Sequence, residues 1–105
     1  MAWVYLIAAG LFEVGWPIGL KWAQDPRKLI IGVVMAVGCL MVSGVLLYLA
    51  QREIALGTAY AVWTGIGAAG TFLLGVWAFG DPGSLGRYLA VALIITGVVG
   101  LKFAH

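Results

Sequence analysis

The chain has 105 residues, of which 64% are hydrophobic and only 10% are charged, and its mean hydropathy is +1.10. A soluble domain needs roughly a quarter of its residues charged to cover its surface. The composition therefore excludes an ordinary soluble domain and predicts a membrane protein. At about 20 apolar residues per crossing, the length has room for about four or five spans and for no separate catalytic, nucleotide-binding or DNA-binding module.

The remaining bulk properties narrow the class further. A net charge of +2 is too small and too scattered to suggest a nucleic-acid partner. The single cysteine, Cys39, excludes a disulfide framework or a cysteine metal site within one chain. We expect neither a cofactor nor a metal.

Four apolar stretches predict helices at about 3–22, 29–51, 57–80 and 85–104. They are separated by charged and turn-forming groups at residues 25–28, 52–53 and 81–87. Each stretch is long enough to cross the hydrocarbon, and the short connections make neighbouring helices antiparallel. We expect an all-α membrane protein in which residues 1–105 form a single four-helix transmembrane domain.

The first stretch is not expected to be a cleaved leader, because it lacks a basic n-region, contains Glu13 and precedes three further spans. Orientation is weakly encoded. With the N-terminus inside, four basic residues lie outside (Lys21, Arg27, Lys28 and Arg87) and two inside (Arg52 and Lys102). Insertion in both directions and insertion with the N-terminus outside therefore both stay open.

Glu13 is the one acid within a predicted span, since the other three acids lie in connections. It stands near the bilayer midplane, where an ionised side chain costs a few kcal/mol. A single carboxyl group that holds either a proton or a cation is the minimal requirement for proton-coupled cation exchange, and it would not serve an anion. We predict that Glu13 binds both the proton and the substrate.

The helical neighbours of Glu13 support a binding site. Gly10 leaves room beside the carboxyl group, and Trp16 offers an indole N–H donor and an aromatic face suited to a cation. Pro17 lacks an N–H and so frees the backbone carbonyl of residue 13. The alternative, in which Trp16 faces lipid and Pro17 is a tolerated kink, stays open.

The third stretch carries an aromatic pair, Tyr60 and Trp63, on one helical face. The pair lines the site or forms an interfacial belt. Gly65 and Gly67 make this helix easy to bend, although close helix packing explains glycine equally well.

Ser43 and the fourth stretch supply the remaining candidates. Ser43 is a partner for Glu13 or is bonded to a carbonyl of its own helix. The fourth stretch has no interior charge, and its small residues Thr96, Gly97 and Gly100 suit a dimer contact. A homodimer would bring two copies of Glu13 into one cavity.

Three segments give the chain a likeness to a known family. They are residues 10–16 with Leu20 and Lys21, residues 57–67, and residues 97–102. Across essentially the whole chain the sequence resembles the small multidrug resistance family, and Trp16, Lys21 and the final Gly-Leu-Lys look like its guanidinium exporter subtype. The resemblance implies an antiparallel, dual-topology homodimer in the plasma membrane that exchanges protons for guanidinium-type cations by alternating access.

The resemblance also implies residue roles. Glu13 is the proton and substrate carboxylate, Trp16 and Ser43 fix its rotamer by hydrogen bonds, and Tyr60 and Trp63 line the cavity. The fourth helix is implied as the dimer contact.

Two positions depart from the family pattern. Pro17 stands where a small residue other than proline is usual, and Gly44 stands where a bulky residue is frequent. Both bear on the width of the pocket and hence on the substrate.

We therefore expect a proton-coupled exporter of guanidinium or a small substituted guanidinium, whose planar donors match carboxylate geometry. A quaternary-ammonium or multidrug cation exporter is the main alternative. A non-transporting accessory membrane subunit and a passive cation channel are further alternatives. Pairing with a homologous subunit in place of a homodimer also stays open.

Overall fold

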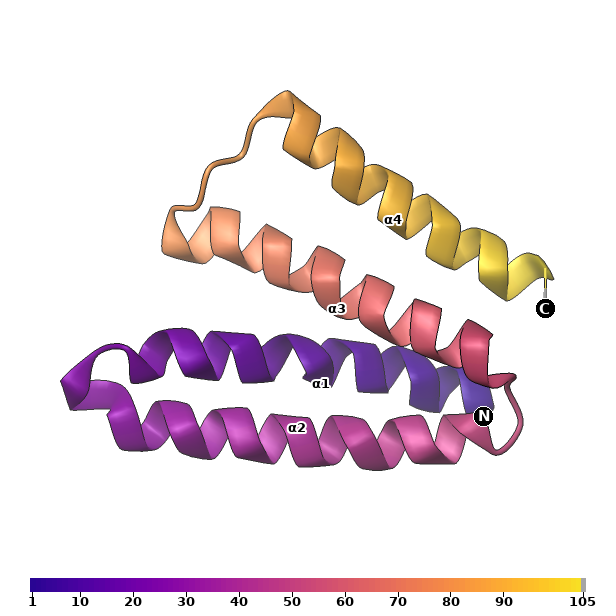
Figure 1. Ribbon diagram of the computed structural model, residues 1–105, viewed down its shortest axis with the longest axis horizontal. Helices are drawn as coiled ribbons and strands as arrows, with labels where there is room; N and C mark the ends of the chain where they lie inside the picture. The colour runs from indigo at the N-terminus through magenta and orange to yellow at the C-terminus, as the bar shows by residue number, and fades with distance from the viewer. Residues whose placement is uncertain (105) are drawn as a thin grey trace.

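The structure, a computed structural model, describes residues 1–104 and is all-helical (Figure 1). Its elements are α1 (Ala2–Ala23), the short 3₁₀ helix η1 (Pro26–Lys28), α2 (Leu29–Gln51), α3 (Leu56–Phe79) and α4 (Leu85–Ala104). The bounds of α2 and α4 are those predicted, and those of α1 and α3 lie one residue away. All four α-helices are long and apolar enough to cross a membrane, as predicted for a multi-pass membrane protein.

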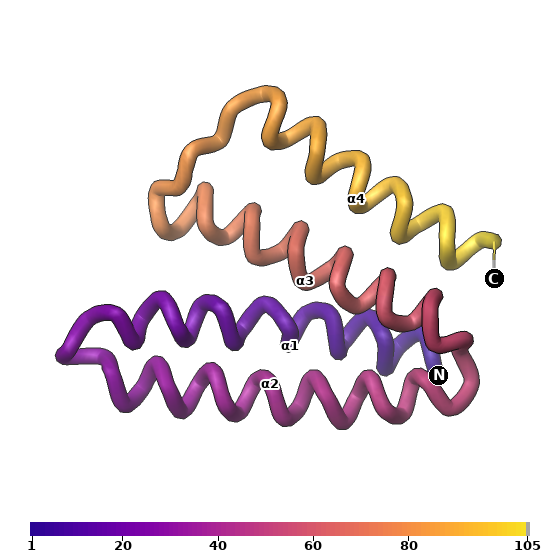
Figure 2. Tube along the Cα trace, in the orientation of Figure 1, coloured from indigo at the N-terminus to yellow at the C-terminus, as the bar shows by residue number. Residues whose placement is uncertain are grey.

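The helices follow one another up and down the bundle. α1 packs against both α2 and α3, whereas α4 packs mainly on α3 (Figure 1). The trace in Figure 2 shows that the turn after α1 and the segment between α3 and α4 lie at the same end of the bundle. α1 and α3 therefore run in the same direction, and their C-terminal ends lie together.

Capping hydrogen bonds and a glycine end α1 and α3 at the charged and turn-forming residues that follow them. After α1, the side chain of Asp25 accepts a hydrogen bond of 3.0 Å from the backbone N–H of Arg27 and so caps η1. α3 ends at Gly80, whose φ of 74° is in the left-handed region that favours glycine. The backbone N–H groups of Gly80 and Asp81 both donate to the carbonyl of Gly75, that of Asp81 at 2.9 Å, and so satisfy a carbonyl in the last turns of α3.

The tightest packing joins the backbones of α1 and α2. A Cβ atom placed on Gly19 would lie 2.6 Å from the carbonyl oxygen of Gly32, and one on Gly32 would lie 2.6 Å from the backbone N of Ala23. Both glycines are buried. The four-residue spacing of Gly15, Gly19 and Ala23 is the small-residue pattern that permits such contact, which was not among the predicted helix contacts.

The outer surface of the bundle is apolar, as a lipid environment requires. Along α4, the large side chains of Leu89, Leu93 and Phe103 are exposed. Gly97 and Gly100 are exposed as well, and a Cβ atom on either would meet nothing within 4 Å. This face of α4 is open to another helix.

Candidate functional site

A cavity of about 350 Å³ lies between α1 and α3. It is lined by Glu13, Trp16, Pro17, Thr64, Gly67, Ala68 and Thr71. The α1 members are three and four residues apart, and those of α3 follow the same spacing, so each helix presents one face to the cavity. The structure thus brings the predicted trio of Glu13, Trp16 and Pro17 together.

Two buried polar atoms in this cavity have no hydrogen-bond partner among the described residues. They are Oε1 of Glu13 and Nε1 of Trp16. The Trp16 side chain lies close enough to act on the Glu13 carboxyl group, but the two atoms do not meet hydrogen-bond geometry. Buried polar atoms in native proteins are nearly always paired, so these two atoms indicate a place for a ligand or water. An ionised carboxylate only accepts hydrogen bonds, and the missing partner of Glu13 is therefore a donor, such as a proton or a cation with N–H groups.

Glycine brings the backbone of α3 against the Glu13 side chain. A Cβ atom on Gly67 would lie 2.6 Å from Cγ of Glu13, and one on Gly65 would lie 2.6 Å from Cγ2 of Val98 on α4. α3 is helical throughout Leu56–Phe79. In this structure both glycines permit close packing, and their role in bending the helix stays a prediction.

We expect Gly67→Ala to weaken the cation transport predicted from the sequence by roughly tenfold or more, because the added methyl group displaces the Glu13 side chain. Uptake into proteoliposomes measures the effect. Gly57→Ala is the matched control, since a Cβ atom at Gly57 on the same helix meets nothing within 4 Å. Equal activity of the two variants would contradict this role for Gly67.

Ser43 links three helices instead of bonding to Glu13. Its hydroxyl donates to the carbonyl of Ala9 on α1 at 2.7 Å and accepts from Nε1 of Trp63 on α3 at 2.8 Å. The two bonds that the sequence left open, to Glu13 and to its own helix, are both absent from the described residues. The physical reason is that Ser43 is completely buried against α1, where the Ala9 carbonyl takes its single donor.

Ser43→Ala is expected to lower the free energy of unfolding by about 1–3 kcal/mol, because it leaves the indole N–H of Trp63 unpaired. Tryptophan fluorescence during denaturant unfolding reports both the stability and the altered Trp63 environment. The control is Ser84→Ala, which removes an exposed hydroxyl that accepts a long 3.4 Å bond from the backbone N–H of Arg87 at the start of α4, and it should cost about 1 kcal/mol or less. A Ser43 variant no less stable than the Ser84 variant would contradict the linking role.

Several other predicted residues lie outside the cavity. The space beside Gly10 is filled, since a Cβ atom there would lie 2.7 Å from the Ile66 side chain, so the expected room beside the carboxyl group is absent. Tyr60 is 55% exposed and packs on Trp63 with ring centroids 5.4 Å apart. Gly44 is exposed, and a Cβ atom there meets nothing within 4 Å, so in this protomer it does not set the cavity width.

Part of the cavity lining on α3 was not predicted from the sequence. Thr64, Ala68 and Thr71 line the cavity, and so does Gly67, which the sequence indicated as a site of helix bending or of close packing. Their signal was the succession of small and hydroxyl-bearing residues at three- and four-residue intervals.

Four helices able to span a membrane, with an unpaired carboxylate oxygen in a cavity between two of them, define a small multi-pass membrane protein equipped to bind a cation. The family model described as Small Multidrug Resistance protein matches residues 1–94. The chain belongs to this family.

Relatives match nearly the full chain. A protein of Yersinia pseudotuberculosis serotype I (strain IP32953) named Guanidinium exporter is 46% identical over 104 residues, which cover 99% of each chain. Guanidinium exporters of Citrobacter freundii and Proteus vulgaris are 41% and 39% identical over the same length, covering 98% and 99% of those chains. All three are named as exporters, which agrees with a transport protein and not an enzyme.

Proposed function

We propose that the protein exports guanidinium or a small substituted guanidinium across the plasma membrane in exchange for protons. The observation that carries the proposal is the buried Oε1 of Glu13, which has no partner among the described residues and borders an open cavity. A carboxyl group that holds a proton in one state and a cation in the other couples the two movements. The names of the relatives support guanidinium as the substrate.

The chemistry of guanidinium suits this cavity. Its planar, rigid array of N–H donors matches the two oxygens of a carboxylate, and it is more weakly hydrated than an ammonium ion. The indole ring of Trp16 lines the same cavity and offers an aromatic face to a cation. The hydroxyl groups of Thr64 and Thr71 each have a lone pair for a remaining donor, although Thr64 already donates to the carbonyl of Tyr60.

A second copy of the chain completes the transporter in this proposal. The exposed face of α4 with Thr96, Gly97 and Gly100 provides the contact. The Thr96 hydroxyl donates to the carbonyl of Ala92 on its own helix at 2.7 Å, so it can face another helix with its donor satisfied. The weak bias of the basic residues is consistent with two opposite orientations, and an antiparallel pair would alternate access by exchanging the roles of its subunits.

Proton flux driven by substrate in proteoliposomes tests the function. The panel contains guanidinium, a small substituted guanidinium, tetramethylammonium and a bulky aromatic quaternary ammonium ion. We expect flux with the two guanidinium ions and little with the others, because the planar fork is needed for paired carboxylate contact. Preferential flux with the bulky ion would favour a multidrug exporter, and no flux with any ion would contradict proton-coupled transport.

A further inference from the structure

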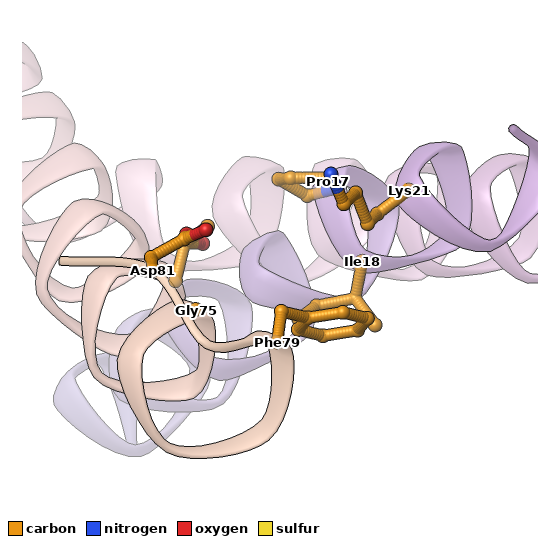
Figure 3. A pocket seen from close by; sticks show the side chains of 7 residues that line it. Pro17, Ile18, Lys21, Gly75, Phe79 and Asp81 are labelled. Carbon is orange, nitrogen blue, oxygen red and sulfur yellow. The ribbon is translucent and has the colours of Figure 1, made fainter.

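A second cavity, of about 170 Å³, adjoins the Glu13 cavity and shares Pro17 and Thr71 with it. It lies between the C-terminal parts of α1 and α3. Figure 3 shows its lining, with Pro17, Ile18 and Lys21 extending from α1 and Gly75, Phe79 and Asp81 from α3 and the segment after it. The shared residues make the two cavities successive parts of one path along the α1–α3 interface.

The outer cavity carries one acid and one base that are not paired. Lys21 and Asp81 both line it, yet within residues 1–104 neither forms an ion pair. The Asp81 carboxylate is therefore open to another cation. Glu13 is the one other acid that lines either of the two cavities.

The fold holds the Asp81 carboxylate over the cavity. Gly80 reverses the chain with its φ of 74°, and the N–H of Asp81 bonds to the Gly75 carbonyl at 2.9 Å. Gly75 is buried and lines the cavity, and a Cβ atom there would meet the carboxylate of Asp81. Gly75 and Gly80 together fix where the acid lies.

The helix ends also favour a cation at this mouth. α1 and α3 run in the same direction, so the partial negative charges of both C-termini lie near the outer cavity. The same dipole disfavours an acid at a helix C-terminus, so the Asp81 carboxylate does not stabilise α3. Asp81 instead places a negative charge at the cavity itself, at an end of the bundle that also carries Lys21, Arg27, Lys28 and Arg87.

We propose that Asp81 is an outer binding residue for the transported cation, which rests in the cavity beside Lys21 as it moves between the membrane surface and Glu13. The inference rests on the proposed function, because it takes guanidinium as the ligand. The planar cation donates to the Asp81 carboxylate. The Lys21 ammonium group opposes tight binding, and a site on a transport path must release its ion as readily as it takes it up.

The test compares guanidinium uptake kinetics of wild type with Asp81→Asn and Asp25→Asn in proteoliposomes. Both variants remove one negative charge at the same end of the bundle, but Asp25 does not line the cavity, and asparagine retains the oxygen that caps η1. We expect Asp81→Asn to raise KM about two- to five-fold with nearly unchanged turnover at saturation. The difference in KM between Asp81→Asn and wild type should be largest at about 0.01 M salt and should be lost at about 1 M salt, because salt screens an exposed charge.

Two further variants separate a binding role from a structural one. Lys21→Gln should lower KM, because it removes a positive charge from the path. Gly75→Ala should raise KM without any change of charge, because the new methyl group displaces the carboxylate. If wild type transports guanidinium and Asp81→Asn behaves as Asp25→Asn does, this inference alone is overturned. If wild type transports no guanidinium, the proposed function falls and the outer site falls with it.

Discussion

Replacing Glu13 with glutamine is expected to reduce proton-coupled guanidinium transport by roughly 100-fold or more. The amide keeps the size of the side chain, but it neither ionises for the cation nor releases a proton. Glu13 is also the one acid within a membrane-spanning helix in the described part of the chain, so no other carboxyl group at that depth replaces it. Guanidinium uptake and the accompanying pH change in proteoliposomes measure the two losses together.

The control for this variant is Glu53→Gln, which removes an acid from the exposed connection between α2 and α3. It changes the net charge equally and should retain close to wild-type activity. Transport that survives in Glu13→Gln would contradict the role of the carboxyl group. Loss of transport in both variants would show that the Glu13 result reflects net charge and not its site.

Substituting Gly32 with alanine is expected to cause the largest loss of stability of any single methyl addition discussed for this protein. The added Cβ would lie 2.6 Å from the backbone N of Ala23 and 2.9 Å from its Cα. Backbone atoms cannot rotate away as a side chain can, so α1 and α2 must separate. We expect the free energy of unfolding to fall by about 1–3 kcal/mol for alanine and by more for leucine.

Unfolding in denaturing detergent, followed by circular dichroism, measures this loss. Gly38→Ala is the matched control on the same helix, because Gly38 is exposed and a Cβ atom there meets nothing within 4 Å. That substitution should be neutral or stabilising, since alanine favours the helix more than glycine does. Similar stabilities of the two variants would mean that the close contact between α1 and α2 does not hold the bundle together.

The helix bounds were predictable to within one residue because charges and turn residues interrupt the apolar runs. Asp25 and Pro26 separate α1 from α2, and the end of α3 coincides with Gly80, whose backbone conformation favours glycine. Length and composition decide which segments cross a membrane, and both are properties of the sequence alone.

The half of the site that lies on α1 was predictable for a similar reason. Glu13, Trp16 and Pro17 are brought together by the periodicity of a single helix. The half on α3 depends on how that helix is rotated about its axis. In a soluble helix the apolar stripe would reveal the rotation, but a membrane helix is apolar on nearly every face.

The partners of Ser43 illustrate what helical periodicity leaves open. Its hydroxyl meets Ala9 of α1 and Trp63 of α3, residues 34 and 20 positions away in the chain. Such contacts depend on how closely the helices pack. Small residues such as Gly19 and Gly32 permit the close approach of α1 and α2, but their side chains do not indicate which residues will meet. The sequence marked Ser43 as polar and central, but three helices must be placed before its partners are known.

Proton release from the purified protein on addition of guanidinium tests the central claim most directly. The claim is that the Glu13 carboxyl group holds either a proton or the cation. In weakly buffered detergent solution, wild type should release protons as guanidinium binds, and Glu13→Gln should release none. Guanidinium binding to wild type without proton release, or equal release by the Glu13→Gln variant, would contradict it.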